Sequence, residues 1–184
     1  ADLQPFTDGK ADQFGFDPER LMDDDLFLDP YYLSAEQIQD FLAETPYNRR
    51  SFLADYSDGG LSTAQFIADA AEEYQINPLV LLVKLQVETS LIYAESEPTR
   101  FRMDHAMGCG CPDGDAICRY APKGLFAQIT CAARLFRQYM NQLDSDGRTL
   151  TGWGPGIEKL TSEQQSITPR TKATAALYTY TPWV

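Results

Sequence analysis

Hydrophobic residues recur along much of the chain at intervals of three and four, which is typical of helices that bury one face. Ser34 and Gln37 form a capping-box pattern before the first such stretch, and Pro46 marks its end. Ser62 and Gln65 repeat the pattern before a second stretch, whose apolar positions again fall on one face. The sequence therefore predicts two amphipathic helices, one after each serine.

The segment 78–93 is apolar on nearly every side, and Asn77 followed by Pro78 is a start signal for a helix. A helix of this kind is expected at the centre of a domain, with its whole surface buried. A one-sided pattern predicts a further, longer helix over about 125–143.

The remaining pattern completes an all-α fold with one loop-rich region. A last helix is expected to begin near Thr168 and Pro169 and to end at Pro182. The segment 95–124 is rich in Gly and Pro, which favours loops and leaves room for a short hairpin there. No stretch alternates convincingly between apolar and polar residues, as a half-buried strand would.

Composition adds a strong acidic bias, and this bias excludes several functions. The 184 residues carry 27 acidic and 15 basic side chains, for a formal net charge of −12. Phosphate binding needs a basic face, so nucleic acid is not an expected partner. The single histidine excludes a multi-histidine zinc site. An apolar run of about 18 residues is missing from the sequence, so no membrane span is expected.

The acidic side chains are concentrated in residues 1–30, which contain nine acids and two bases. We therefore expect an acidic N-terminal arm over 1–33 and one domain of ordinary size over 34–184. The run Asp23–Asp25 is a candidate calcium site, but it lacks the spacing of an EF-hand loop, and no metal is assigned. The segment 100–137 is locally positive, because six bases there outnumber three acids.

All four cysteines lie between Cys109 and Cys131. Their spacing fits a zinc site poorly, whereas an even number in a short stretch is typical of disulfides in exported proteins. Four cysteines allow three pairings. The spacing favours Cys111–Cys118, which closes a small loop, with Cys109–Cys131 tying that loop to the following helix. We therefore expect a disulfide-stabilised loop region in a secreted or cell-envelope protein.

Glu88 is the carboxylate that the hydrophobic pattern singles out. It falls on the stripe formed by Leu81, Leu85 and Ile92 in the nearly apolar helix. Burial disfavours the charged form of a carboxyl group, and a general acid has to be uncharged before it donates its proton. The alternative is an ordinary ion pair with Lys84, four residues earlier.

Four stretches of the sequence resemble motifs of one protein family, and the resemblance rests on their number and on their order along the chain. Residues 70–92, which read AAEEYQINPLVLLVKLQVETSLI, resemble the catalytic helix of the lysozyme-like superfamily, more narrowly of lytic transglycosylases and glucosaminidase-type peptidoglycan hydrolases. Residues 107–113 (MGCGCPD), 120–129 (YAPKGLFAQI) and 173–182 (ATAALYTYTP) resemble three further motifs of that family. The resemblance covers about residues 34–182.

The resemblance implies a lysozyme-like helical domain that cleaves the glycan strand of peptidoglycan, with Glu88 as general acid and base. It assigns supporting or substrate-binding roles to six further residues: Thr89, Ser90, Asp113, Gln128, Tyr178 and Tyr180. Thr89 or Ser90 would support the geometry of Glu88 by hydrogen bonds. Asp113 or Asp104 would be the second carboxylate if water is the nucleophile. Neither route needs a metal or an organic cofactor.

Two other classes of function stay open on the sequence. A non-catalytic glycan-binding or structural module on the same fold would keep the pattern without cleaving the strand. A helical protein-interaction domain would instead use the acidic arm. His105 is expected to be a structural or surface residue and not a catalyst. The protein is expected to be a monomer that acts on peptidoglycan or a related amino-sugar polymer.

Overall fold

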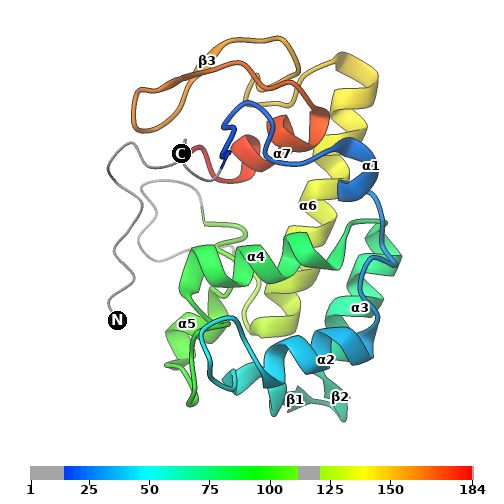
Figure 1. Cartoon of the computed structure of the whole chain (residues 1–184), viewed down its shortest axis with the longest axis vertical. Helices are drawn as coiled ribbons and strands as arrows, with labels where there is room; N and C mark the ends of the chain where they lie inside the picture. Colours follow the sequence, from blue (N-terminus) through cyan, green and yellow to red (C-terminus); the bar gives the residue numbers. More distant parts are fainter. Residues whose placement is uncertain (1–14, 112–120, 184) are drawn as a thin grey trace. The chain divides into compact units, whose positions relative to one another are not determined.

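A computed structural model describes residues 15–111 and 121–183, and most of their regular structure is helical (Figure 1). The elements in chain order are α1 (Asp24–Phe27), α2 (Ala35–Ala43), the 3-10 helix η2 (Phe52–Ala54), β1 (Ser57–Asp58), β2 (Leu61–Ser62), α3 (Thr63–Tyr74), α4 (Pro78–Thr89), α5 (Arg100–Asp104), α6 (Leu125–Asp146), β3 (Lys159–Leu160), β4 (Ser166–Ile167) and α7 (Lys172–Tyr180). The mainly helical class predicted from the sequence is confirmed.

Three of the predicted start signals lie where helices begin, whereas the last helix, expected to begin near Thr168 and Pro169, begins at Lys172 after its cap Thr171. Ser34 caps α2 in a complete capping box with Gln37, and Ser62 caps α3. Asn77 caps α4, which then opens with Pro78. These side chains satisfy backbone N–H groups that have no partner inside the helix, so the local sequence sets all three boundaries.

The loop-rich segment 95–124 differs from its prediction. In its described residues the backbone forms the short helix α5, capped by Thr99, and no strand. Two antiparallel hairpins lie elsewhere: β1 pairs with β2, and β3 pairs with β4. Each of these strands has two residues, which is too short for an alternating pattern to be recognised in the sequence.

The described residues divide into two compact units, and the first is the continuous segment Leu26–Arg137. Within it, α2 packs on α3 and α3 packs on α4. Its core is made of aliphatic side chains together with an edge-to-face pair of Phe27 and Phe136, whose ring centroids are 5.7 Å apart. This unit carries the whole of α4 and therefore the candidate catalytic residue.

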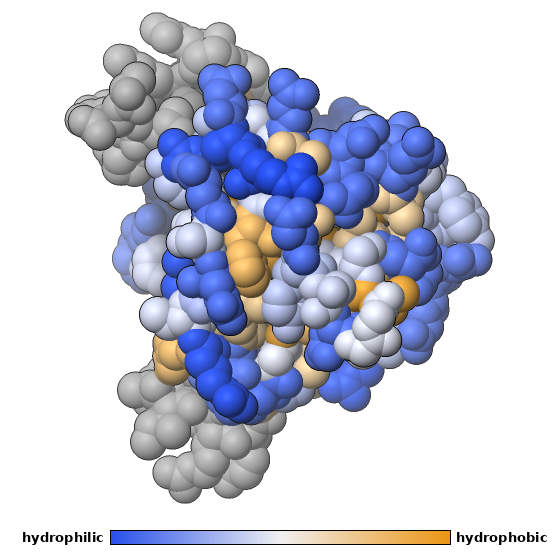
Figure 2. All heavy atoms as spheres, turned by 90° about the horizontal axis from the view of Figure 1, so that it is seen from below, coloured by the Kyte–Doolittle hydropathy of each residue, from blue (hydrophilic) through white to orange (hydrophobic). Residues whose placement is uncertain are grey.

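Helix α4 is buried on one side only, which corrects the expectation that its whole surface is covered. Leu81, Leu82 and Leu85 are buried, whereas Val83 is 48% exposed and Val87 is 60% exposed. The two valines are four residues apart and share one helix face, so apolar composition alone did not reveal which face meets the core. Exposed hydrophobic atoms among hydrophilic ones are visible on the face shown in Figure 2.

The second unit joins residues 15–25 to residues 138–183. Backbone groups of the N-terminal segment hydrogen-bond to α7 and to the residue that caps it. The N–H of Leu21 donates to Thr174 Oγ1 (2.9 Å), and Thr171 Oγ1 donates to the carbonyl of Met22 (2.7 Å). The chain passes between the two units after Asp25 and again after Arg137.

The acidic run considered as a calcium site takes part in these same contacts. Asp24 Oδ1 accepts the N–H of Ala173 at the start of α7 (2.8 Å), and Asp23 pairs with Arg20 (2.7 Å). In the described ranges, no three or more His, Cys, Asp or Glu side chains gather as metal ligands. Each helix in those ranges is also too short or too polar to cross a bilayer.

Candidate functional site

Glu88 lies in the last turn of α4, and 22% of its side chain is exposed. The helix ends directly after it because Ser90 adopts the left-handed conformation (φ 54°). The N–H of Leu91 then donates back to the carbonyl of Leu85 (3.1 Å), which closes the end of the helix. A partly exposed carboxyl group thus stands at the end of a helix that is otherwise anchored in the core.

The carboxyl group of Glu88 is ion-paired. Lys84 Nζ donates to Glu88 Oε1 at 3.0 Å, and only 6% of the lysine side chain is exposed. Burial lowers the pKa of Lys84, while the nearby charge of Glu88 and the hydrogen bond act in the opposite direction. The pair that the sequence allowed as the alternative to catalysis is therefore present, and it belongs to the same site.

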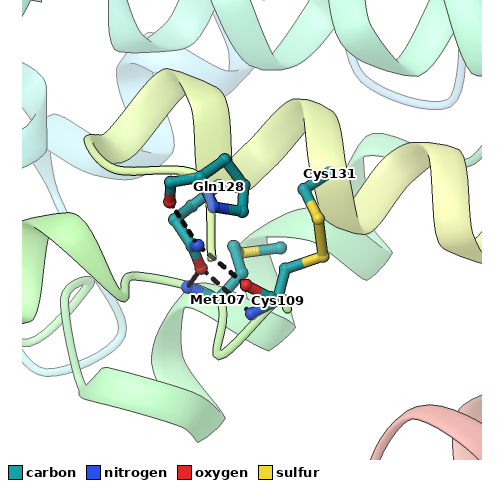
Figure 3. The surroundings of a disulfide bond; sticks show 5 residues. Met107, Cys109, Gln128 and Cys131 are labelled. Carbon is teal, nitrogen blue, oxygen red and sulfur yellow. Dashed lines mark hydrogen bonds between the residues drawn. A yellow bond between two sulfur atoms is a disulfide. The ribbon is translucent and has the colours of Figure 1, made fainter. Parts of the chain in front are cut away.

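The loop that follows α5 is locked to α6 by Gln128, which is completely buried (Figure 3). Gln128 Oε1 accepts the N–H groups of Met107 (3.2 Å) and Cys109 (3.0 Å). Its Nε2 donates to the carbonyls of Cys109 (3.0 Å) and Pro122 (2.7 Å). The Cys109–Cys131 disulfide joins the same two segments, so this loop is fixed by both a covalent bond and hydrogen bonds.

Gly108 brings this loop against Glu88. A Cβ atom placed on Gly108 would lie 3.3 Å from Glu88 Oε2, and the glycine has a left-handed backbone (φ 64°). Thr89 Oγ1 also donates to the carbonyl of Ala106 (2.8 Å), which ties the end of α4 to the loop. The absence of a side chain at Gly108 therefore leaves room for the carboxyl group.

The predicted supporting residues act on the loop and the helix end. The hydroxyl of Thr89 bonds to the carbonyls of Leu85 (3.4 Å) and Ala106, so any support it gives Glu88 passes through the backbone. Ser90 is exposed and contributes the left-handed residue that ends α4. Gln128 fills its hydrogen bonds with backbone groups of the loop, which makes it a supporting residue.

The two candidate tyrosines belong to the other unit, and Glu88 belongs to the unit Leu26–Arg137. Tyr178 is buried, its ring stacks on Trp153 at 5.0 Å, and its hydroxyl donates to the carbonyl of Pro18 (2.9 Å). Burial raises the pKa of Tyr178 to about 12. Tyr180 is the last residue of α7 and is partly exposed. Tyr178 therefore has the environment of a core residue.

Two predictions fall on residues outside the described ranges: the substrate or carboxylate role of Asp113, and the Cys111–Cys118 disulfide, because of Cys118. The predicted Cys109–Cys131 bond is present. Asp104, the other candidate for a second carboxylate, lies 3.6 Å from the guanidinium of Arg100.

His105 has a structural environment. It is largely buried, and its ring lies against that of Phe101. Its Nδ1 is 2.8 Å from the carbonyl of Phe101, and Lys123 Nζ is 2.6 Å from its Nε2. Since the lysine is a donor only, Nε2 accepts and the Nδ1 proton points to the carbonyl.

Two arginines of the locally positive segment 100–137 bond to carbonyl groups at the ends of helices. Arg102 donates to the carbonyls of Thr89 (2.6 Å) and Ser90 (3.3 Å) at the end of α4. Arg137 donates in the same way to the carbonyls of Tyr74 and Gln75 at the end of α3. Cations are favourable at helix C-termini, so these two arginines have a structural explanation that does not require an anionic ligand.

Sequence reasoning missed the role of Gly108 and treated Lys84 only as an alternative to catalysis. The signal for Lys84 was its position among leucines, where a lysine needs a charged partner. A hollow of about 680 Å³ lies in the other unit, at the end of α6, and includes Gln142, Asp146 and Arg148 in its lining.

Searches of protein-family models, of curated proteins and of solved structures found no match to the chain.

Proposed function

We propose that this protein cleaves the glycan strand of peptidoglycan, with Glu88 as general acid and base in a lysozyme-like helical domain. One observation carries the proposal. Glu88, Gly108 and Gln128 come from three separate stretches that resemble motifs of one family: Gly108 lies against Glu88, and Gln128 bonds to the residues on both sides of Gly108. The disulfide supports an extracytoplasmic location, because such bonds persist in oxidising compartments.

The proposed chemistry needs one proton transfer in each direction. Protonated Glu88 gives its proton to the glycosidic oxygen, and the electron pair of the breaking C–O bond stays with that oxygen. The resulting carboxylate then takes a proton from the nucleophile that attacks the anomeric carbon. That nucleophile is water in a hydrolase and the sugar's own C6 hydroxyl in a lytic transglycosylase.

The products distinguish these routes and test the function itself. We expect mass spectrometry of purified peptidoglycan after incubation with the protein to show shortened glycan fragments. Fragments with 1,6-anhydro ends would assign the transglycosylase route, and fragments with reducing ends would assign hydrolysis. Sacculi that stay intact while glycan binds to the protein would contradict cleavage.

The ion pair itself favours a second candidate, a non-catalytic glycan-binding module. The Glu88 carboxyl group is held in a salt bridge with Lys84 (3.0 Å between Nζ and Oε1), four residues apart on one helix, and an ordinary structural ion pair has the same arrangement. On this proposal the same surface binds amino sugars without breaking them. Binding of chitooligosaccharides together with unchanged product spectra would support it.

Gly108→Ala is expected to reduce cleavage by about tenfold, because the new methyl group would lie 3.3 Å from Glu88 Oε2 and shift the carboxyl group slightly from its position. Gly59→Ala is a matched control: Gly59 has a similar backbone (φ 58°), and a Cβ there meets no atom within 4 Å. Both variants should lose about 1 kcal/mol of unfolding free energy, since alanine is disfavoured in the left-handed region. Cleavage assays beside urea unfolding check this, and equal activity in the two variants would contradict it.

A further inference from the structure

Lys84 carries a positive charge at a buried position of α4, a helix made mostly of apolar residues. The residue is only 4% exposed, and its neighbours Leu81, Leu82 and Leu85 are buried with it. A buried ammonium group loses its hydration, which costs several kcal/mol unless a charged partner and hydrogen bonds compensate. Lysine is therefore an unexpected residue at this position on packing grounds alone.

Stability does not explain the lysine. Apolar residues of similar volume in place of a buried ion pair often leave a protein as stable or make it more stable. The lowered pKa of Lys84 reflects this unfavourable desolvation. The pairing with Glu88 at 3.0 Å gives the ammonium group a defined partner at the carboxyl group proposed to do the chemistry.

Other charged or titratable groups around this end of α4 have contacts of their own. Arg102 binds the carbonyls of Thr89 and Ser90, and Asp104 is paired with Arg100 on α5. His105, directly after α5, and Lys123, two residues before α6, bond to each other. Lys84 differs from these groups because it forms its salt bridge with Glu88 from a buried position.

We propose that Lys84 is a positioning residue for the reaction proposed above: it anchors Oε1 of Glu88 and sets the orientation of the carboxyl group. With Oε1 held, Oε2 lies on the side of Gly108. As Glu88 gives up its proton, the negative charge that develops on it lies beside a fixed cation at low dielectric. Lys84 is buried behind Glu88, so it acts through the carboxyl group and not on the substrate.

This inference rests on the proposed function and is tested with three variants of the full chain. Lys84→Met removes the charge and keeps an unbranched side chain, and Lys84→Arg keeps a cation. Lys172→Met is the control, because it removes an exposed lysine that pairs with Asp144 at 2.5 Å. The measurements are kcat and KM on a soluble glycan fragment, thermal unfolding, and the 13C signal of the Glu88 carboxyl carbon in glutamate-labelled protein.

We expect Lys84→Met to lower kcat by about 10- to 100-fold with KM changed less than about twofold, since a misplaced catalytic group slows chemistry without weakening binding. Lys84→Arg should recover part of kcat, and Lys172→Met should leave it unchanged. A kcat that is unaffected in Lys84→Met, or equally reduced in Lys84→Met and Lys84→Arg, would overturn the positioning role.

Failure of the proposed function gives a different result. In that case neither the native protein nor Glu88→Gln cleaves glycan, and the carboxyl signal decides the remaining question. A signal that moves in Lys84→Met but stays in place in Lys172→Met supports the anchoring of Glu88 by Lys84. A signal that is the same in both variants overturns it.

Discussion

Glu88→Gln is expected to slow glycan cleavage by at least about 100-fold, because glutamine cannot donate or accept the proton that the reaction requires. The amide keeps the size of the carboxyl group and an oxygen toward Lys84, so the end of α4 should keep its geometry. The rate of fragment release from peptidoglycan, measured by mass spectrometry, checks the prediction.

The control for this variant is Glu44→Gln. Glu44 is an exposed glutamate directly after α2, so the same chemical change there should leave cleavage within about twofold of the native rate. Glu88→Gln leaves Lys84 beside a neutral partner, so both variants are compared at a temperature where circular dichroism shows them folded. Native-rate cleavage by folded Glu88→Gln would refute its catalytic role.

The second large effect is on stability. Cys109→Ala with Cys131→Ala removes a bond between residues 22 positions apart, and the loop entropy released in the unfolded chain predicts a loss of about 3 kcal/mol. Urea unfolding of the oxidised native protein and the double variant measures the difference. The four hydrogen bonds of Gln128 remain, so the folded loop should keep its position.

A serine version of the same double variant separates the bond from the packing. Both cysteines are buried, so serine adds the cost of burying two hydroxyl groups, which alanine does not. We expect the serine variant to be less stable than the alanine variant, with both below the native protein. A loss of less than about 1 kcal/mol in the alanine variant would contradict the entropic argument.

The part of the fold that could be predicted came mostly from local sequence signals. Capping side chains predicted the starts of α2, α3 and α4, because a cap bonds to the backbone of its own helix and does not depend on distant contacts. The exposure of Val83 and Val87 was not predictable in this way. Which face of an apolar helix meets solvent depends on where neighbouring helices lie, and the periodicity of α4 does not contain that information.

Some residues of the candidate site could be named from the sequence, but their arrangement could not. Glu88 and Gln128 could be named from motifs, yet three of the four backbone bonds of Gln128 go to residues 19 to 21 positions earlier in the chain. The same holds for Gly108, whose importance comes from its distance to Glu88 Oε2. The Lys84 pair was the exception, since residues four apart on one helix always share a face.

The unit built from residues 15–25 and 138–183 has a consequence for the order of folding. The hydrogen bonds between its two segments join residues that are far apart in the sequence: Thr171 and Met22 are 149 positions apart, and Tyr178 and Pro18 are 160 positions apart. The segment Leu26–Arg137 is continuous, so during synthesis it can acquire its core while α7 is still unmade. Residues 15–25 leave the ribosome before that segment, and their hydrogen bonds to α7 and its cap cannot form until that helix has been made, so these residues are among the last to reach their final contacts.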